Sequence, residues 1–156
     1  MIEIKLANPN DVISQQLMAA LTAELSGRYD ENTAVDVTRM PELHNVTQDD
    51  VQFVIVWRNE QAIGCGAIRP IDANVTEIKR MYVHPSARGH GISRKILAKL
   101  EALAQDAGFS KTRLETGINQ PEAIKLYETS GYTQIPCYGI YAQNPDSLCY
   151  EKELNF

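Results

Sequence analysis

Residues 77–93 read Glu-Ile-Lys-Arg-Met-Tyr-Val-His-Pro-Ser-Ala-Arg-Gly-His-Gly-Ile-Ser, and this stretch decides the fold. The residues from Thr76 to Val83 predict a strand. A small loop with Gly89 and Gly91 follows, and an amphipathic helix begins at Ile92. The first turn of a helix leaves backbone N–H groups unpaired at the positive end of the helix dipole, and glycines let a ligand approach them closely. The segment therefore predicts a cradle for a diphosphate.

Two other phosphate-binding loops are excluded by the spacing of the glycines. The chain has no Gly-x-x-x-x-Gly-Lys-Ser/Thr run and no Gly-x-Gly-x-x-Gly run, so neither a P-loop nor a Rossmann dinucleotide site is predicted. Arg88, His90 and Arg94 add positive charge to the loop. A plain strand-to-helix turn remains the alternative, because two nearby glycines also suit that geometry.

Outward from this stretch, the periodicity predicts alternating strands and helices. The first helix is expected to start at Asn8-Pro9 and to end at Gly27, and the second is followed by Gly108. A third helix is expected to start at a sequence that resembles a capping box, Asn119 to Glu122, and to end at Gly131. Residues 28–50 and 132–141 stay undecided. Strands are expected over 2–6, 51–57, 62–69, 76–83, 112–116 and 148–154, and the apolar helix stripes comprise Ile13, Leu17, Leu21 and Leu25, then Ile92, Ile96, Leu100, Leu103 and Ala107, then Ala123, Leu126 and Tyr127.

Composition and charge narrow the class of protein. The 156 residues are 44% hydrophobic and 22% charged, which suits one globular domain over 1–156. The formal net charge of -5 argues against sequence-independent binding to nucleic acid or to an anionic membrane. The N-terminus has no apolar run typical of a signal peptide and no stretch is long enough to span a membrane, so a cytoplasmic location is expected.

The cysteines predict neither a metal site nor a nucleophile. Cys65, Cys137 and Cys149 are widely spaced and form no Cys-x-x-Cys pair, so structural zinc is not expected and no metal is predicted. We interpret all three as small buried or half-buried hydrophobic residues.

The stretch 77–93 resembles the acetyl-CoA-binding motif of the GNAT acyltransferases, Arg/Gln-x-x-Gly-x-Gly/Ala after a strand. The motif falls on Arg88, Gly91 and Ser93, and Ser93 departs from the Gly/Ala pattern. Asn119-Gln-Pro-Glu-Ala-Ile-Lys-Leu-Tyr127, followed by Gly131-Tyr132, resembles the second block of the family. The resemblance implies an α/β single-domain GNAT fold, a mixed, mostly antiparallel sheet of six to seven strands with helices on both faces.

The resemblance also implies acetyl-CoA as co-substrate. Its thioester would lie between the strands over 76–83 and 112–116, which would splay apart, and Ser93 would weaken binding without abolishing it. The implied cofactor-binding residues are Met81, Tyr82, Val83, Arg88, Gly89, His90, Gly91, Ile92, Ser93, Asn119 and Ala123.

The chemistry of amide formation asks for a proton acceptor and a proton donor. An alkyl amine with a pKa of about 10.4 is neutral in about one molecule in 2,500 at pH 7. Selecting the neutral form therefore costs about 4.6 kcal/mol, which a proton acceptor helps to offset. By the resemblance, Glu77 is the candidate base, with a bound water or a merely structural ion pair as the alternatives. Tyr127 is the candidate donor to the CoA thiolate, with a packed aromatic as the alternative. His84 and His90 are expected to be surface or phosphate-adjacent residues.

The predicted reaction is transfer of an acetyl group to a primary amine of a small molecule, which attacks directly in a ternary complex. A catalytically weak acyl-CoA-binding sensor and a protein or peptide N-acetyltransferase are the alternatives. The acceptor pocket is expected in residues 28–50, 69–75 and 136–146, with Arg69, Tyr138 and Tyr141 as candidates. A homodimer is one option for the assembly.

Overall fold

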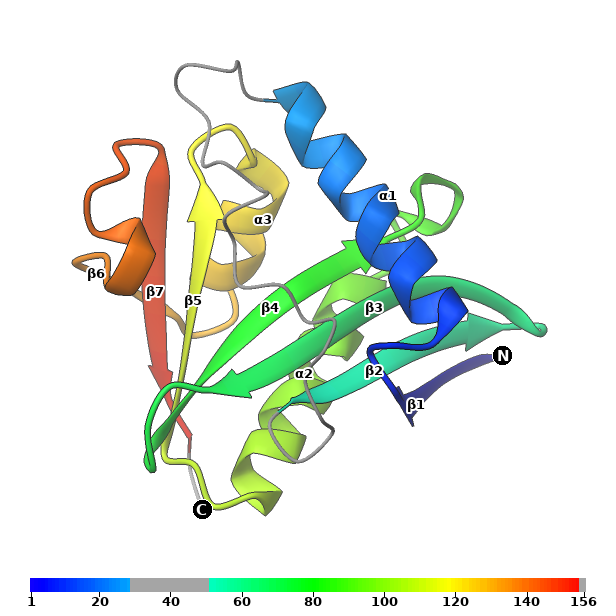
Figure 1. Cartoon of the computed structure of the whole chain (residues 1–156), viewed down its shortest axis with the longest axis horizontal. Helices are drawn as coiled ribbons and strands as arrows, with labels where there is room; N and C mark the ends of the chain where they lie inside the picture. Colours follow the sequence, from blue (N-terminus) through cyan, green and yellow to red (C-terminus); the bar gives the residue numbers. More distant parts are fainter. Residues whose placement is uncertain (29–50, 155–156) are drawn as a thin grey trace.

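A seven-stranded mixed sheet forms the body of the protein, in the order β1-β2-β3-β4-β5-β7-β6 (Figure 1). The computed structural model describes residues 1–28 and 51–154. The pair β4–β5 is parallel, and the other neighbouring pairs are antiparallel. The strands are β1 (Ile2–Ala7), β2 (Gln52–Arg58), β3 (Gln61–Pro70), β4 (Val75–Val83), β5 (Lys111–Gly117), β6 (Thr133–Ile135) and β7 (Ser147–Glu153).

Helices cover both faces of the sheet. Figure 1 shows α1 (Val12–Arg28) on one face, while α2 (Ile92–Asp106) and α3 (Pro121–Glu128) lie on the other. Two short 3-10 helices, η2 (Pro85–Ala87) and η3 (Gly139–Tyr141), join strands to the following elements. The predicted fold class is therefore confirmed. Within the described residues, no helix combines the length and the apolar character that a membrane crossing needs.

The core has two layers because both faces of the sheet are buried. Along β2, Val54 and Val56 pack in the layer with α2 and α3, while Phe53 and Ile55 pack in the layer with α1. Strands covered on both faces read as nearly continuous apolar runs, which is why residues 51–57 lack a polar face. The layer beneath α2 and α3 also contains Tyr127, which positions that side chain for the site described below.

Several boundaries differ from the sequence prediction. Helix α1 continues through Gly27 to Arg28, so the expected stop at Gly27 is wrong. Ile13 is exposed, whereas its neighbour Ser14 is buried and donates a hydrogen bond to the carbonyl oxygen of Asn8. The undecided residues 132–141 form β6 and η3, and residues 29–50 of the other undecided segment lie outside the described residues.

Strands β4 and β5 separate half-way along their length. Their pairing runs from Val75 opposite Lys111 to Ile78 opposite Leu114, and both strands continue beyond it. The register between β3 and β4 shifts at the same level, and Arg80 there has a positive φ of 59°. The buried Cys65 thiol on β3 donates a hydrogen bond to the Arg80 carbonyl oxygen at 3.2 Å. This irregularity turns the second half of β4 away from β5, as the sequence analysis expected.

Gly66 tests the packing of α2 on the sheet, and Gly27 in α1 provides a comparison. A Cβ at Gly66 would lie 2.7 Å from Ile96 Cγ2 and 3.0 Å from Leu100 Cδ1, both on α2. Gly66→Ala is therefore expected to lower the free energy of unfolding by about 1–3 kcal/mol in urea denaturation. Gly27→Ala meets nothing within 4 Å and is expected to raise it by about 0.5 kcal/mol. An unchanged midpoint for Gly66→Ala would mean that α2 shifts at no cost.

Candidate active site

The cleft opens where β4 and β5 separate. Its outer half has a volume of about 380 Å³ and lies against the loop before α2, whereas its inner half is small, about 70 Å³, and extends toward β5. Four residues line both halves and mark their junction: Leu21, Met81, Gln120 and Tyr127. A long, narrow ligand in the outer half would therefore present its end to the residues of the inner half.

The loop before α2 presents open backbone to the outer half. Gly89 and Gly91 have φ values of 83° and 75°, and a Cβ at either would meet nothing within 4 Å. Gly91 is the N-cap of α2 and makes no side-chain cap hydrogen bond. The positive end of this 15-residue helix therefore borders the cleft without a capping side chain. This geometry suits an anionic group such as a diphosphate.

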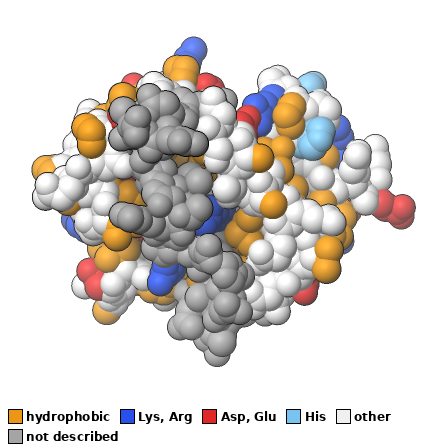
Figure 2. Space-filling view, turned by 45° about the horizontal axis from the view of Figure 1, so that its top comes forward, with side chains coloured by type: hydrophobic (Ala, Val, Ile, Leu, Met, Phe, Trp, Pro, Cys, Tyr) orange, Lys and Arg blue, Asp and Glu red, His pale blue; other side chains and the backbone are white. Residues whose placement is uncertain are grey.

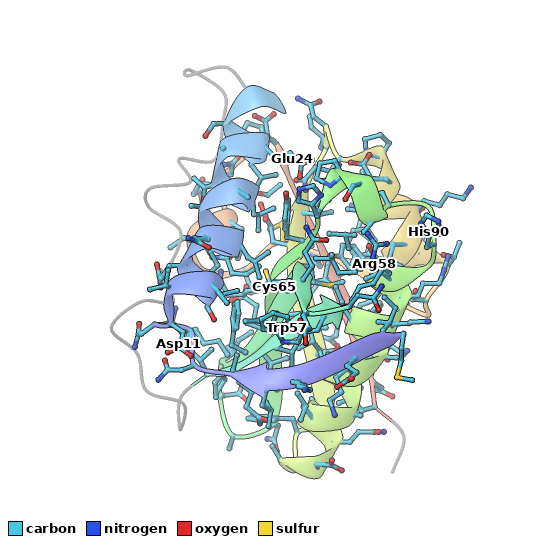
Figure 3. The ribbon with its side chains drawn as sticks, turned by 90° about the vertical axis from the view of Figure 1, so that its right-hand side faces the viewer. Asp11, Glu24, Trp57, Arg58, Cys65 and His90 are labelled. Carbon is cyan, nitrogen blue, oxygen red and sulfur yellow. A yellow bond between two sulfur atoms is a disulfide. The ribbon has the colours of Figure 1, made fainter. Side chains whose placement is uncertain are left out.

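Arg88 holds this loop against its neighbours. Its Nε donates a hydrogen bond to the Val83 carbonyl oxygen at 2.9 Å, and Nη2 lies 2.6 Å from Glu24 Oε1 on α1. The guanidinium also lies 5.8 Å from the centre of the Tyr82 ring. Figure 3 shows Glu24 on α1 toward the middle of the molecule and His90 on the side away from α1. Arg88 thus joins the end of β4 to α1 across the mouth of the cleft.

The structure places most of the predicted cofactor-binding residues in the lining of the outer half. Those that line it are Met81, Tyr82, Val83, Arg88, Gly89, Gly91, Ile92, Ser93 and Ala123. His90 is not among them, because its ring turns back onto its own loop, with Nδ1 3.0 Å from the Arg88 carbonyl oxygen. Arg94 and Lys125 also line this half, and Figure 2 shows the two described histidines beside basic side chains on one edge of the surface.

Gln120, the neighbour of Asn119, caps α3 and lines the cleft. Gln120 is the N-cap of α3, so the predicted cap at Asn119 is wrong, and Gln120 lines both halves of the cleft. The Gln120 side-chain oxygen accepts a hydrogen bond from the Gly117 backbone N–H at 2.9 Å, which fixes the turn between β5 and α3. Pro121, which favours the first helical position, was the signal in the sequence that could have placed the cap at residue 120.

Tyr127 reaches the junction of the two halves from α3. Its ring packs in the core, edge-on against Tyr132 at 5.9 Å, and the residue is only 7% exposed. Its hydroxyl donates a long hydrogen bond, 3.7 Å, to Met81 Sδ on β4. Burial, and then the nearby charge of Glu115, raise the pKa of Tyr127 above its usual value. The phenol is therefore protonated at neutral pH, as an ordinary tyrosine is.

Glu77 belongs to a buried polar network beside the cleft. Its Oε2 accepts a hydrogen bond from the Tyr138 hydroxyl at 2.8 Å, and its Oε1 lies 3.5 Å from Lys79 Nζ. Lys79 Nζ also donates to the Tyr141 hydroxyl at 2.7 Å, and burial lowers the pKa of Lys79. Tyr141 and Lys79 line the inner half, whereas Glu77 does not. Tyr138 and Tyr141, both acceptor-pocket candidates, thus meet the candidate base.

Among the described residues, the carboxylate that lines the inner half is Glu115, which the sequence analysis missed. It follows Leu114, the last β5 residue paired with β4, and its Oε2 accepts a hydrogen bond from Ser147 Oγ on β7 at 2.6 Å. Burial raises the pKa of Glu115, although the Ser147 hydrogen bond and the Lys79 charge act in the opposite direction. Alternation along the predicted strand 112–116 was a signal for it, because Leu114 faces the core and Glu115 must face the other side.

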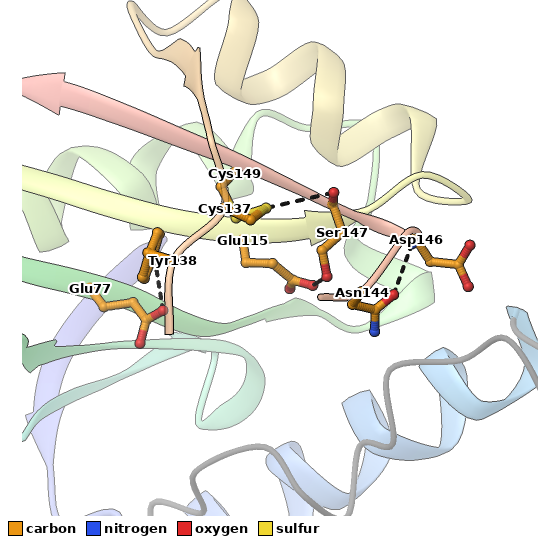
Figure 4. Close-up of a disulfide and its surroundings, with 8 residues drawn as sticks. All are labelled: Glu77, Glu115, Cys137, Tyr138, Asn144, Asp146, Ser147 and Cys149. Atoms are coloured by element: carbon orange, nitrogen blue, oxygen red, sulfur yellow. Dashed lines mark hydrogen bonds between the residues drawn. A yellow bond between two sulfur atoms is a disulfide. The ribbon is translucent and has the colours of Figure 1, made fainter. Parts of the chain in front are cut away.

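A disulfide links Cys137 to Cys149, beside the Glu77 and Glu115 carboxylates (Figure 4). The expectation that these two residues are unbonded hydrophobic side chains is therefore wrong. The antiparallel pairing of Ile135 with Cys149 brings the two residues together, with their Cα atoms 5.1 Å apart, and strand pairing cannot be read from cysteine spacing. Cys65 fits the expectation, since it is buried and burial raises its pKa to about 12.

Removing the disulfide is expected to destabilise the fold. It closes a loop of 12 residues and sits next to Tyr138, so Cys137→Ala should lower the free energy of unfolding by about 3 kcal/mol. Reducing the wild type should have the same effect, and the reductant should not affect the variant. Urea denaturation with and without dithiothreitol measures this. Equal stability of the oxidised and reduced wild type would contradict the prediction.

Two other expectations concern Arg69 and metals. Arg69 pairs in register with Glu77 on the neighbouring strand but does not line either half of the cleft, so the structure does not bring it into the candidate site. Within residues 1–28 and 51–154, no three His, Cys, Asp or Glu side chains gather in a group that could hold a metal ion.

The family model for the acetyltransferase (GNAT) family matches residues 15–132. The chain belongs to the GNAT family. It is 33% identical over 141 residues to the "IAA acetyltransferase" of Azospirillum brasilense, which covers 90% of this chain and 92% of that protein. It is also 28% identical over 114 residues to the N-acetyltransferase YsnE of Bacillus subtilis, covering 72% of this chain and 76% of that protein.

Solved structures of GNAT proteins share the fold. A Klebsiella pneumoniae structure assigned as an acyl-CoA N-acyltransferase superposes with a TM-score of 0.81 at 33% identity, covering 99% of both chains. A GNAT acetyltransferase from Elizabethkingia anophelis, solved with acetyl-CoA bound, superposes with a TM-score of 0.70 at 17% identity over 98% of both chains. The second likeness concerns the fold alone.

Proposed function

We propose that this GNAT protein transfers an acetyl group from acetyl-CoA to the nitrogen of a small primary amine, by direct attack in a ternary complex. One observation carries the proposal. The open helix N-terminus at Gly91 and the Tyr127 hydroxyl lie along one cleft, at the outer half and at its junction with the inner half. A ligand with an anionic end and a reactive end fits that order, and acetyl-CoA has a diphosphate and a thioester.

The outer half supplies binding and orientation. Backbone N–H groups of the loop around Gly89 and Gly91 hold the diphosphate, and the basic side chains of Arg88 and Arg94 add positive potential. The second half of β4, which has left β5, lies along the pantetheine. Ser93 lines the same half beside Gly89 and Gly91, and serine is small enough to be compatible with binding.

The inner half supplies proton transfer. Attack of the amine on the thioester carbon forms the C–N bond, and collapse of the tetrahedral intermediate breaks the C–S bond. Tyr127, whose hydroxyl lies at the junction of the two halves, gives its proton to the departing thiolate. A carboxylate on the α1-facing side of the sheet, Glu77 or Glu115, takes the proton that the acceptor must lose before attack.

The acceptor is proposed to be a small molecule because the inner half is small, about 70 Å³, and partly closed by Tyr141. The relative from Azospirillum brasilense bears the name "IAA acetyltransferase", which supports acetyl transfer for this chain at the level of the reaction.

An amine panel tests the proposed function. Purified full-length protein is incubated with acetyl-CoA and one of three additions: a small primary amine, a basic peptide or no acceptor. Release of CoA is followed with a reagent that reacts with its free thiol. Turnover with a small amine and not with peptides supports the proposal. Turnover with peptides alone would make the protein a peptide N-acetyltransferase. Tight acetyl-CoA binding without turnover on any acceptor would make it an acyl-CoA sensor.

A further inference from the structure

Two carboxylates lie on the same face of the sheet, and they differ in what surrounds them. Glu77 sits where β4 is still paired with β5, opposite Arg113, and both of its oxygens have partners, the Tyr138 hydroxyl and Lys79. It is 7% exposed and does not line the cleft. An acceptor amine would have to displace this network before reaching Glu77.

Glu115 lies beyond the last pair of β4 and β5 and lines the inner half. Figure 4 shows its side chain held by Ser147, while Glu77 turns toward Tyr138. Among the described side chains, that of Ser147 donates a hydrogen bond to Glu115 Oε2. Tyr127 lines the same space, and the charge of Glu115 acts on its hydroxyl. Glu115 is therefore the carboxylate beside the junction of the two halves.

The surroundings of Glu115 also suit a base. Among the described residues, the charged and titratable groups around Glu115 are Lys79, Glu77 and Arg80 on β4, Tyr127 on α3, and Tyr138 and Tyr141 at η3, together with the Ser147 hydroxyl on β7. Burial outweighs the Lys79 charge and the Ser147 hydrogen bond, so the pKa of Glu115 is raised. A carboxylate with a raised pKa is a stronger base toward an ammonium group, and it is ionised once the pH exceeds that pKa.

We propose that Glu115 is the catalytic base of this protein and that its acceptors are primary alkyl amines that enter the inner half as ammonium ions. This inference rests on the acetyltransferase function proposed above. The ammonium gives one proton to Glu115 Oε1, and the neutral nitrogen then attacks the thioester carbon. The thiolate leaves with the proton of Tyr127. The second proton lost by the nitrogen returns to Tyr127, and Glu115 releases its proton to solvent, so one proton is released per acetyl group transferred.

Glu115→Gln and the matched Glu77→Gln test the assignment on the full chain. With an alkyl amine that the wild type accepts, Glu115→Gln should lower kcat/KM by about 10²-fold or more and remove the acidic limb of its pH profile. With a fluorinated analogue whose amine is already neutral at pH 7, the loss should be much smaller. Glu77→Gln should keep the acidic limb, and both variants should keep the acetyl-CoA-induced rise in melting temperature.

Stability provides a control on folding. Because the pKa of Glu115 is raised in the folded state, its charged form opposes folding, and this cost appears as the pH rises through the folded pKa. Glu115→Gln should therefore be at least as stable as the wild type at neutral pH. Loss of the acidic limb in Glu77→Gln instead, or an equal loss of rate with both amines, would overturn the assignment of Glu115. Absence of CoA release by the wild type with every amine would overturn the proposed function itself.

Discussion

Tyr127→Phe is expected to lower kcat by about 10²- to 10⁴-fold while leaving acetyl-CoA affinity almost unchanged. The hydroxyl lies at the junction of the two halves of the cleft, and its only hydrogen bond to a described side chain is the long one to Met81 Sδ. It is therefore held weakly in the free protein and is free to follow a developing thiolate. An interaction that matters mainly in the transition state lowers kcat when it is removed and leaves binding intact.

The ring of Tyr127 stays in place in this variant, so stability should change by only about 1 kcal/mol. Tyr132→Phe is the matched control. Tyr132 packs against Tyr127 but does not line the cleft. The Tyr132→Phe variant loses the hydrogen bonds of this hydroxyl to Thr112 and Glu101. Steady-state kinetics and isothermal titration with acetyl-CoA separate the two effects. Weaker acetyl-CoA binding at an unchanged kcat would make Tyr127 a binding residue and not the proton donor.

Gly91→Asp is expected to abolish the rise in melting temperature that acetyl-CoA gives the wild type. A ligand that binds the folded state alone raises stability by mass action, so loss of the shift reports loss of binding. Gly91 lies at the N-terminus of α2 with open space around its Cα, and an Asp side chain would fill the space proposed for the diphosphate with like charge. The folded protein should survive, because Asp tolerates the left-handed backbone at a cost of about 1–2 kcal/mol.

Gly108→Asp is the control for that substitution. Gly108 also has a positive φ, 91°, and a Cβ there meets nothing within 4 Å, but it follows the opposite end of α2. The Gly108→Asp substitution introduces the same backbone strain and the same charge at a position that does not line the cleft. Differential scanning fluorimetry across acetyl-CoA concentrations compares both variants with the wild type. A normal shift in Gly91→Asp would show that the diphosphate does not bind at the N-terminus of α2.

The local features of the site could be predicted from the sequence. The strand–glycine–helix order at residues 77–93 and the helical face that carries Tyr127 depend on periodicity and on backbone preferences within a few residues. For the same reason, the order of strands and helices followed from the apolar pattern, while helices on both faces of the sheet were implied by the family resemblance. The errors at Gly27, at Ile13 and at Asn119 are errors of one or a few positions, because helix ends depend on side-chain contacts that the pattern does not contain.

The inner half of the cleft was decided by the tertiary structure. Glu77 and Glu115 are 38 positions apart in the printed sequence. The parallel pairing of β4 with β5 ends at Ile78 and Leu114, so that Glu77 lies within the paired part and Glu115 lies beyond it, beside the cleft. The Cys137–Cys149 disulfide likewise follows from the pairing of β6 with β7. The sequence by itself determined which side chains each element carries toward which face. Strand register determined which of them meet, because pairs distant along the chain approach each other only when the sheet has formed.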